Sequence, residues 1–255
     1  MTVQMQEALK EKVCIITGAS SGIGKSCAEL FLKQKAKIVA VDINQERLDN
    51  TVKELEALGN PEDILSLTLS VRDEAQMNEM AAKTLERFGQ IDILVASAGI
   101  LRLGGQLKPL ADTPTDEWDA IIETNLKGTF LSNRAVLGAM IEQKQGDIVN
   151  VSSSSGRQGR AFDAPYCASK FGIIGLSESL AEEVSSYGVR VQTILPDSVD
   201  TPFWEQNGSS GIKATVTIPP ERVAQLILHL VTLPRDAFMY NTFIAPFKTR
   251  KRKRK

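Results

Sequence analysis

Six short apolar runs, each as long as a buried strand, alternate along this chain with longer amphipathic segments. The runs span residues 12–17, 37–42, 64–69, 91–97, 146–152 and 189–195 and are rich in Val and Ile. A run that is apolar throughout is typical of a strand buried on both faces, as in a parallel sheet. The segments between the runs, such as residues 46–58, place apolar residues at helical spacing. Six such repeats with short connections predict a single α/β domain with a doubly wound parallel sheet.

The composition is that of an ordinary globular protein. Apolar residues make up 42% and charged residues 24% of the 255 residues, which is typical of such domains. The longest apolar stretches are too short to span a bilayer. Residues 1–12 are polar and lack the apolar core of a signal peptide. We therefore expect a cytoplasmic protein.

Cysteine and histidine are too scarce for several kinds of site. The three cysteines, Cys14, Cys27 and Cys167, lack the spacing of a disulfide framework or a zinc site. His229 is the single histidine, which argues against a histidine-based metal site and a Ser-His-Asp triad. We expect no metal, packing roles for the cysteines, and acid-base chemistry from another residue type.

Positive charge is concentrated at the end of the chain. The formal net charge is −1, but residues 248–255, KTRKRKRK, hold seven of the 30 basic residues and leave 23 against 31 acidic residues in the body. Such a tail can bind nucleic acid or an acidic membrane surface, or fold against the acidic body of a neighbouring subunit. We expect a solvated tail rather than a nucleic-acid or membrane partner.

A glycine-rich turn, TGASSGIG, joins the first predicted strand to the first helix at residues 17–24. Glycines allow a tight turn and let a pyrophosphate approach the backbone. The backbone amides and the dipole at a helix start favour negative charge. Gly18, Gly22 and Gly24 therefore predict a dinucleotide site, although a plain tight turn could have the same sequence.

Asp42 strengthens this interpretation because it ends the second predicted strand, 18 residues after Gly24. An acidic residue there can accept hydrogen bonds from the adenosine ribose; it could also cap the next helix. NADP carries a phosphate at that ribose, and two like charges about 4 Å apart repel by about 1 kcal/mol in water and about 4 kcal/mol near a protein surface. We expect NAD to be preferred. NADP is not excluded, because Lys25 and Arg47 are near in sequence.

The stretch APYCASKFG places Tyr166 and Lys170 four residues apart, on one face of a predicted helix. A nearby ammonium stabilises phenolate and lowers the pKa of the phenol, so Tyr166 could exchange a proton with a substrate oxygen. Ser153 follows a predicted strand, at the end of the sheet where ligands bind. Asn125 lies in a helical pattern, a poor place for Asn unless its amide has a task.

Taken together, these motifs resemble the short-chain dehydrogenase/reductase family over nearly the whole chain. TGASSGIG matches the TGxxxGxG cofactor turn, Tyr166 to Lys170 match YxxxK, and Asn125, Ser153, Tyr166 and Lys170 match the catalytic tetrad in order and spacing. The resemblance implies a Rossmann fold and hydride transfer between a nicotinamide and an alcohol or carbonyl carbon.

The resemblance also implies a role for each residue of the tetrad. Tyr166 is the acid/base, and Ser153 orients the substrate oxygen. Lys170 binds the nicotinamide ribose and lowers the pKa of Tyr166, and Asn125 holds a water that relays protons. The implied cofactor contacts are Gly18, Ser20, Ser21, Gly22, Ile23, Gly24, Asp42, Ser70, Val71, Ala98, Gly99, Tyr166, Lys170, Pro196, Val199 and Thr201. The implied assembly is a homodimer or homotetramer, with the helices of Asn125 and Tyr166 between subunits.

Three segments depart from the family's usual sequence. Its NNAG reads Ala96-Ser97-Ala98-Gly99 here, and Ser97 could supply part of the hydrogen bonding of the missing Asn. Ser70 stands where an Asp usually contacts the adenine. Asp197 replaces the Gly after Pro196 and adds bulk and charge beside the expected nicotinamide pocket; Asp tolerates unusual backbone angles better than most residues.

The resemblance divides the chain into a cofactor-binding domain, residues 1–247, and the basic tail, residues 248–255. Residues 202–219, with Phe203, Trp204 and Ile212, correspond to the substrate lid. The opposite wall contains Arg102, which either meets an anionic substrate or is simply solvated. The end of the chain is similar to that of relatives acting on small hydroxy acids and sugars.

These features predict an NAD(P)-dependent oxidoreductase acting on a secondary alcohol or ketone, such as a small hydroxy acid, a sugar or a polyol. One alternative within the family is a 3-oxoacyl-thioester reductase that takes its substrate from an acyl carrier protein. An alternative from another class is a non-catalytic nucleotide-sensing protein. Substrate, direction and stereochemistry are left open by the sequence.

Overall fold

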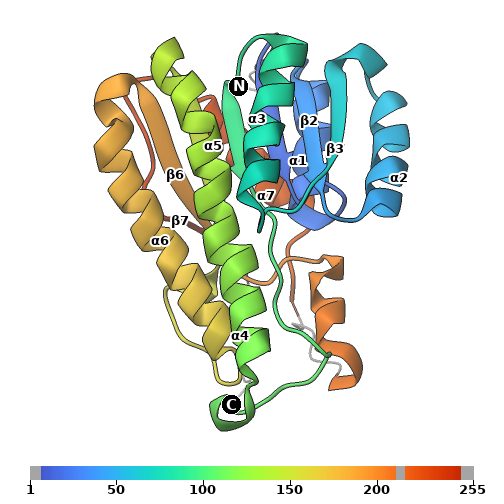
Figure 1. The fold of residues 1–255 in the computed structure, drawn as a ribbon, viewed down its shortest axis with the longest axis vertical. Coiled ribbons are helices and arrows are strands. Elements are labelled where there is room, and N and C mark those ends of the chain that lie inside the picture. Colours follow the sequence, from blue (N-terminus) through green and yellow to red (C-terminus); the bar gives the residue numbers. More distant parts are fainter. Residues whose placement is uncertain (1–6, 211–215, 248–255) are drawn as a thin grey trace, which may run out of the picture.

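The central sheet contains seven parallel strands among residues 7–210 and 216–247, the parts of the chain that this computed structural model describes (Figure 1). The strands are β1 (Val13–Thr17), β2 (Lys37–Asp42), β3 (Ile64–Thr68), β4 (Ile93–Ala96), β5 (Gly146–Val151), β6 (Val189–Pro196) and β7 (Thr242–Ile244). Their order is β3-β2-β1-β4-β5-β6-β7, and every neighbouring pair is parallel. The doubly wound sheet and its six predicted strands are confirmed. The short edge strand β7 is one strand more than predicted.

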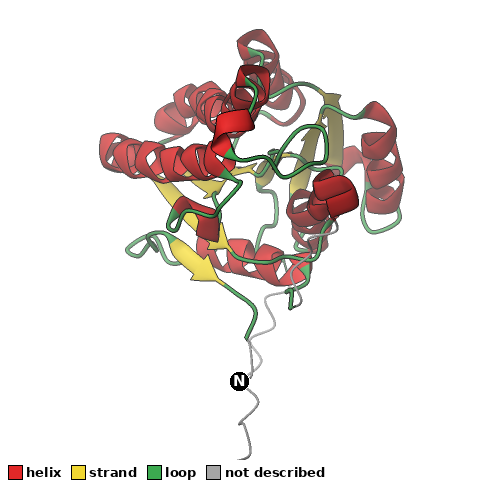
Figure 2. Ribbon diagram, turned by 90° about the horizontal axis from the view of Figure 1, so that it is seen from below, coloured by secondary structure: helices red, strands yellow, loops and turns green. Residues whose placement is uncertain are grey.

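Helices cover both faces of the sheet (Figures 1 and 2). They are α1 (Gly22–Lys33), α2 (Gln45–Glu56), α3 (Glu74–Phe88), α4 (Thr115–Ile121), α5 (Gly128–Gln143), α6 (Ala164–Val184) and α7 (Pro220–Val231). Successive side chains of a strand point to opposite faces. Ile16 accordingly packs in one core with Phe31 of α1, and Ile15 packs in the other with Met77 of α3 and Leu131 of α5. Both faces are buried, which explains why the strands are apolar throughout.

Local sequence sets several helix ends next to the site. The side chain of Asn44 accepts a hydrogen bond from the Arg47 amide and caps α2. Asp73 caps α3 in the same way, by accepting from the Gln76 amide. These caps fix where the chain leaves the carboxyl ends of β2 and β3.

A single π-helical turn, Ile122–Lys127, joins α4 to α5 in one continuous rod (Figure 1). Turns of this kind are rare and are frequent at functional sites. Asn125 lies within it. The helical pattern around Asn125 is therefore confirmed, but with a local change of pitch that the sequence did not predict.

The carboxyl end of β1 is the switch point of the sheet, because β2 and β4 flank β1 and the chain runs outward in both directions from there. Ligands of doubly wound folds bind in the crevice at this point. Figure 2 looks onto this end of the molecule. The glycine turn follows β1 directly, so the fold places it at the crevice.

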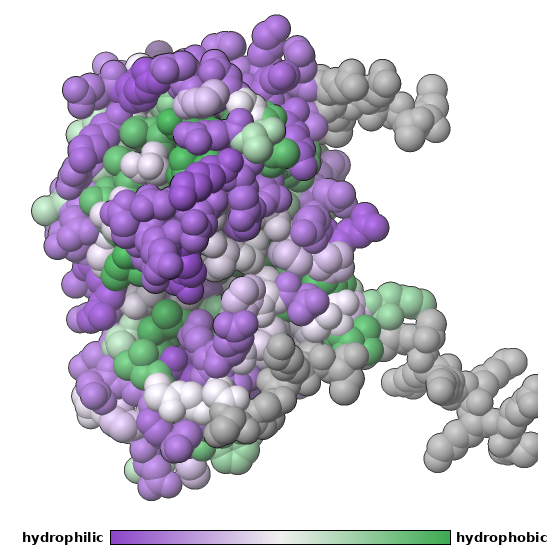
Figure 3. All heavy atoms as spheres, turned by 90° about the vertical axis from the view of Figure 1, so that its right-hand side faces the viewer, coloured by the Kyte–Doolittle hydropathy of each residue, from purple (hydrophilic) through white to green (hydrophobic). Residues whose placement is uncertain are grey.

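Some expectations concern parts of the chain outside the described residues. The basic tail, residues 248–255, is one of them, and so are residues 211–215 of the predicted lid, with Ile212. Within the described residues no helix is both long and apolar enough to cross a membrane. The face drawn in Figure 3 carries mainly hydrophilic residues.

Candidate active site

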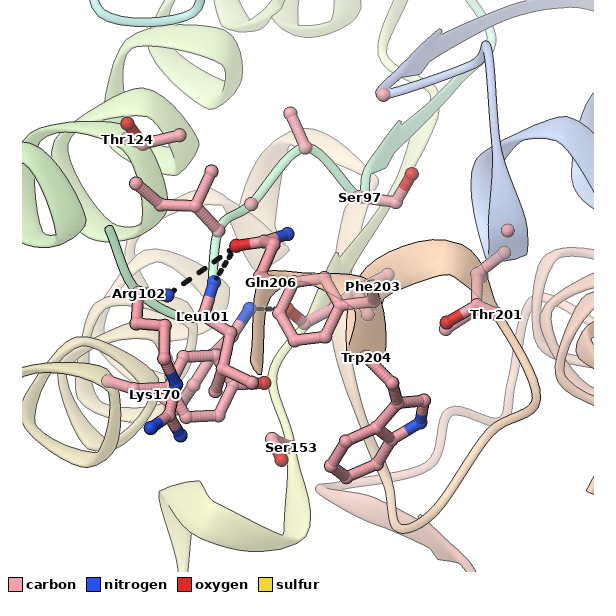
Figure 4. A pocket seen from close by; sticks show the side chains of 18 of the residues that line it. Ser97, Leu101, Arg102, Thr124, Ser153, Lys170, Thr201, Phe203, Trp204 and Gln206 are labelled. Atoms are coloured by element: carbon pink, nitrogen blue, oxygen red, sulfur yellow. Dashed lines mark hydrogen bonds between the residues drawn. The ribbon is translucent and has the colours of Figure 1, made fainter. Parts of the chain in front are cut away.

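A cavity of about 1010 Å³ opens at the carboxyl ends of the strands. Its wall is formed by the glycine turn, the ends of β2, β4, β5 and β6, the first turns of α6, and residues 201–207. Ligand pockets span about 300–1,000 Å³, so this cavity can hold a large ligand together with a small one. Figure 4 shows Ser153, Lys170, Thr201, Phe203 and Trp204 around it.

The glycine turn has the shape of an anion cradle. Gly18 and Gly22 lie in the left-handed region, at φ 69° and 52°. A Cβ at Gly18 would lie 2.9 Å from Cα of Ala98, and one at Gly24 would overlap the carbonyl oxygen of Gly18. The first turn of α1 contains no acidic residue. Backbone amides are thus open to a pyrophosphate at this helix start, and the residues fit a dinucleotide.

Asp42 is buried at the end of β2 and lines the cavity. Its carboxylate accepts hydrogen bonds from the backbone amides of Ser20, at 3.2 Å, and Asn44, at 3.0 Å. The alternative that Asp42 caps the next helix is wrong, because Asn44 caps α2. Ser20 is not on the cavity wall: its side chain is buried under the turn, and its amide holds Asp42 instead.

Most other predicted cofactor contacts lie on the wall. The wall includes Ser21, Ile23, Ser70, Val71, Ala98, Gly99, Pro196, Val199 and Thr201. Thr201 lies against the glycine turn, because a Cβ at Gly22 would be 3.1 Å from its methyl carbon. The hydroxyl of Ser70 accepts a hydrogen bond from the Arg72 amide at 3.3 Å and so stabilises the turn after β3.

Ser97 supplies hydrogen bonding at the position where the family usually has Asn, as expected. Its hydroxyl donates a hydrogen bond to the carbonyl oxygen of Thr17 at 2.5 Å. The Thr17 hydroxyl in turn accepts from the amides of Ser97, at 3.2 Å, and Ala98, at 3.3 Å. These bonds join the ends of β1 and β4 where the crevice opens.

Tyr166 and Lys170 lie on successive turns at the start of α6, and both are buried. The Lys170 ammonium lies 5.6 Å from the centre of the Tyr166 ring and donates a hydrogen bond to the carbonyl oxygen of Val151 at 2.9 Å. Ser153 follows β5 and hydrogen-bonds the Tyr166 phenol. The Ser153 hydroxyl also accepts from the Ser155 amide at 3.1 Å. Three of the four predicted tetrad residues thus meet on the cavity wall.

Burial shifts the pKa values of both Tyr166 and Lys170. It raises the pKa of Tyr166 to about 12, although the hydrogen bond with Ser153 and the charge of Arg160 act in the opposite direction. Burial also lowers the pKa of Lys170 to about 8. The expected lowering of the Tyr166 pKa by Lys170 is therefore wrong for this structure, because loss of water penalises the phenolate more than the neighbouring groups stabilise it.

Asn125 is fully buried one layer behind the wall. Its side-chain oxygen accepts from the Ile100 amide at 2.8 Å, and its nitrogen donates to the Ile100 carbonyl at 2.9 Å and to the Ser169 hydroxyl at 3.1 Å. A Cβ built at Gly99 would be 3.1 Å from the Asn125 oxygen and 3.7 Å from the Lys170 nitrogen. Asn125 thus fixes the chain after β4 beside Lys170.

The carboxylate of Asp197 is held by polar groups of the loop after β5. It accepts from the Ser154 hydroxyl at 2.9 Å and from Nη2 of Arg160 at 2.8 Å. Asp197 is not among the residues with positive φ, so the backbone here does not require glycine. The added charge of Asp197 is balanced by Arg160, a partner that the sequence did not reveal.

Residues 202–210 form short 3₁₀ turns over the substrate side of the cavity, at the position predicted for the lid. The Phe203 ring packs on Tyr166, with ring centres 5.9 Å apart. The Trp204 indole donates to the Val199 carbonyl at 2.7 Å. The Gln206 side chain accepts from the Leu101 amide at 2.7 Å (Figure 4). Sequence reasoning missed Gln206, since its partner is 105 residues away.

The alternative that Arg102 is simply solvated is wrong, although Arg102 does line the cavity as predicted. Its side chain is buried and forms an ion pair with Asp163, the residue before α6. Cys167 is buried, and its sulfur accepts a hydrogen bond from the Arg160 amide at 3.3 Å. The expected packing role of Cys167 agrees with this position.

Comparison with known proteins identifies the class. A family model described as short chain dehydrogenase matches residues 12–210. The chain is 39% identical over 231 residues to the 3-oxoacyl-[acyl-carrier-protein] reductase FabG of Thermotoga maritima, a match covering 88% of this chain and 92% of that protein. It is 38% identical over 198 residues to the (2S)-[(R)-hydroxy(phenyl)methyl]succinyl-CoA dehydrogenase subunit BbsD of Thauera aromatica, covering 78% and 77%.

A solved structure agrees with the sequence comparisons. The closed form of serine dehydrogenase complexed with NADP+ superposes with a TM-score of 0.83 at 30% identity, covering 91% of this chain and 94% of that chain. The chain therefore belongs to the short-chain dehydrogenase/reductase family. It is an oxidoreductase of carbonyl and hydroxyl groups with an NAD(P)-binding Rossmann fold.

Proposed function

We propose that the protein transfers hydride between NAD(P) and a secondary alcohol or its ketone, with Tyr166 as the acid/base. One observation carries the proposal: the buried Tyr166 phenol hydrogen-bonds Ser153, lies beside Lys170, and faces the same cavity as the glycine turn. A proton donor and an anion cradle in one cavity are what carbonyl reduction by a dinucleotide requires.

Each residue has a task in this reaction. Bound NAD(P) supplies the hydride in reduction and accepts it in oxidation. With a pKa of about 12, Tyr166 is protonated at neutral pH and can donate a proton to the carbonyl oxygen. Ser153 orients that oxygen by a hydrogen bond. Phe203 and Trp204 form the lid that excludes water from the substrate.

The cofactor would be held by groups along the whole cavity. The glycine turn and the start of α1 would bind the pyrophosphate, and Asp42 the adenosine ribose. Lys170 would donate to the nicotinamide ribose, and Thr201 to the carboxamide. Asn125 would hold the water that carries protons between Lys170 and solvent.

Cofactor affinity should depend on pH through Lys170. Its pKa of about 8 means that the donating ammonium is present below that pH and lost above it. A hydrogen bond from a charged group contributes about 1.5–3 kcal/mol, so we expect the Kd for NAD(P)H to rise about tenfold or more between pH 7 and 9.5. Fluorescence titration of the bound nicotinamide measures this. Lys170→Met should bind more weakly and show no such step; an identical step in that variant would contradict the role.

NAD should be the preferred form, because Asp42 would meet the extra phosphate of NADP. Lys25 does not relieve this repulsion, since its ammonium pairs with Glu54 at 2.6 Å. Arg47 lies on the same cavity wall and leaves NADP as a usable alternative. The similar serine dehydrogenase binds NADP+, and the preference proposed here rests on Asp42 alone.

Replacing Asp42 by Asn removes the charge and keeps one acceptor oxygen, although the amides of Ser20 and Asn44 donate to different oxygens of the carboxylate. We expect the ratio of kcat/KM for NADP to that for NAD to rise about tenfold or more, since like charges near a surface repel by about 1 to 4 kcal/mol. Steady-state rates with both cofactors measure the ratio. Asp49→Asn, an exposed change in α2, is the control. An unchanged ratio in Asp42→Asn would refute the preference.

The substrate class has two candidates within the family. We favour a small hydroxy acid, sugar, polyol or similar carbonyl compound, because the end of the chain is similar to that of relatives acting on such compounds. The 39% identity to FabG supports a 3-oxoacyl thioester bound to a carrier protein as the second candidate. Rates on a panel of alcohols and ketones, compared with acetoacetyl-CoA, distinguish the two.

The rival from another class is a nucleotide-sensing protein without catalysis. The assembled Ser153, Tyr166 and Lys170 argue against it. Turnover of either cofactor with any member of the panel supports the enzyme. Absence of turnover, together with salt-dependent nucleic-acid binding that disappears on truncation after Phe247, would support the rival.

We also propose a homodimer or homotetramer. Trp118 of α4, Phe130 of α5 and Phe171 of α6 are exposed large apolar residues in the isolated chain, and exposed apolar surface marks association sites. These helices are the ones that the family packs between subunits. Light scattering gives the mass of the assembly, and a monomer at micromolar concentration would contradict the proposal.

A further inference from the structure

Arg102 and Asp163 form an ion pair across the substrate side of the cavity. Nη2 of Arg102, on the chain after β4, donates to Oδ1 of Asp163, the residue that precedes α6. The Arg102 side chain is 6% exposed and that of Asp163 is 17% exposed. A buried ion pair that loses one partner leaves an uncompensated charge, so each residue fixes the other.

Both partners are attached to functional segments. The amides of Leu101, at 2.7 Å, and Arg102, at 3.4 Å, donate to the side-chain oxygen of Gln206 in the lid (Figure 4). On the other side, the Asp163 carbonyl accepts from the Cys167 amide at 2.8 Å. That bond closes the first turn of α6, which contains Tyr166. The ion pair therefore connects the lid and the loop after β4 to the turn that positions the phenol.

The pair also carries charge next to Tyr166. Burial is the main cause of the raised pKa of Tyr166, and the nearby Asp163 carboxylate raises that pKa further. Burial raises the pKa of Asp163 itself, and Arg102 and Arg160 act against that rise. Arg102 is thus the buried ion-pair partner of a carboxylate whose charge acts on the phenol.

Several elements place charged, titratable or hydrogen-bonding groups near the phenol. These groups are Lys170 and Cys167 of α6, Asp163 before it, Arg160 of the preceding loop, Ser153 after β5, Arg102 after β4, Asp197 after β6, which pairs with Arg160, and Glu205 of the lid. Asp197 already has Arg160 as its partner. Asp163 is paired with Arg102 instead.

We propose that Arg102 and Asp163 are a positioning pair for Tyr166: they hold the first turn of α6 against the loop after β4 and offset the Asp163 charge beside the phenol. The inference deepens the proposed function and rests on it for the role of Tyr166. It assigns to Arg102 a task toward the acid/base instead of toward the substrate.

The two single variants should shift the ionisation of Tyr166 in opposite directions. Arg102→Met removes the ion-pair partner of Asp163 and raises the titration midpoint of the phenol, whereas Asp163→Asn removes the carboxylate charge and lowers it. We expect shifts of about half a pH unit or more, from a charge within several ångströms in a partly buried site. The double variant should lie closer to the unchanged protein than either single variant does.

Phenolate absorbance measures this without cofactor or turnover. The chain has three tyrosines, and the two others, Tyr187 and Tyr240, are exposed. In a Tyr187→Phe, Tyr240→Phe background the signal comes from Tyr166 alone, and circular dichroism at each pH reports folding. Arg157→Met, an exposed change between β5 and α6 and away from the cavity wall, is the matched control.

Opposite shifts of the Tyr166 midpoint in the two variants support the proposed pair. Midpoints equal to that of the unchanged protein, or shifts of both variants in the same direction, overturn it. If Arg102→Met does not fold, Asp163→Asn decides by whether its midpoint falls, and Arg102→Lys should keep the midpoint near that of the unchanged protein. Failure of the proposed function has a different signature, which is absence of NAD(P)-dependent turnover in the unchanged protein. The titration separates the two failures.

Discussion

The Tyr166→Phe variant should lose about 10²–10⁴-fold in kcat, the usual contribution of a positioned acid/base, and still bind cofactor. The change removes one hydroxyl and leaves the ring. That ring keeps its contacts with Phe203, at 5.9 Å between ring centres, and with the Lys170 ammonium, at 5.6 Å. The loss should therefore appear in kcat and leave the Kd of NAD(P)H within about threefold, because Tyr166 is one of many expected cofactor contacts and the others are unchanged.

Steady-state kinetics with NAD(P)H and a ketone, beside fluorescence titration of the cofactor, measure both quantities. Tyr187→Phe is the matched control, since Tyr187 is exposed after α6 and is not on the cavity wall. Tyr166→Phe with unchanged kcat would remove the acid/base role. Lost cofactor binding in the same variant would assign Tyr166 a structural task instead.

The Gly24→Ala variant should lose cofactor affinity by about 100-fold or more. A Cβ at Gly24 would overlap the carbonyl oxygen of Gly18 and come within 2.8 Å of the Ser97 hydroxyl oxygen. Backbone atoms cannot yield to such an overlap without moving the start of α1 away from β1. The amides that would bind the pyrophosphate then separate, and each lost charge-assisted hydrogen bond costs about 1.5–3 kcal/mol.

Fluorescence titration with NADH and thermal unfolding of the same sample test this expectation. Gly138→Ala in α5 is the matched control, because a Cβ there meets no atom within 4 Å. Ala is the better helix former by about 0.5–1 kcal/mol, so the control should be slightly more stable and bind normally. Normal NADH affinity in Gly24→Ala would show that the turn does not hold the dinucleotide.

Most of the fold could be predicted because it depends on local pattern. The six longer strands are apolar runs of a length that fits a buried strand, and the glycine turn follows the first of them. β7 was missed because three residues, Thr242–Ile244, are too few to show any periodicity. The π-helical turn at Asn125 was missed for a similar reason, since the change of pitch leaves the helical pattern intact.

The site could be predicted where its chemistry rests on short spacing. Tyr166 and Lys170 are one helical turn apart, and Ser153 is fixed by the end of β5. The Arg102–Asp163 pair spans 61 residues and the Leu101–Gln206 bond 105 residues, so neither leaves a local signal. The direction of the Tyr166 pKa was also missed, because burial outweighs the nearby ammonium and is a property of the folded chain.

Asp197 shows how tertiary structure resolves a doubt raised by sequence. Read alone, a carboxylate in place of glycine threatens the nicotinamide pocket. In the fold, Arg160 and the Ser154 hydroxyl hold that carboxylate at 2.8 and 2.9 Å. The departure from the family is thus a compensated substitution, and the partner lies 37 residues away in sequence.

Isotope transfer tests the central claim most directly. The unchanged protein is incubated with NADH or NADPH deuterated at the hydride-donating carbon, and with ketones that include ethyl acetoacetate; mass spectrometry and NMR then locate the label. Hydride transfer beside Tyr166 predicts one deuterium on the carbinol carbon of the product, and about 10²–10⁴-fold less labelled product with Tyr166→Phe in the same time. A protein that binds the reduced cofactor yet yields no labelled alcohol from any ketone would contradict the account.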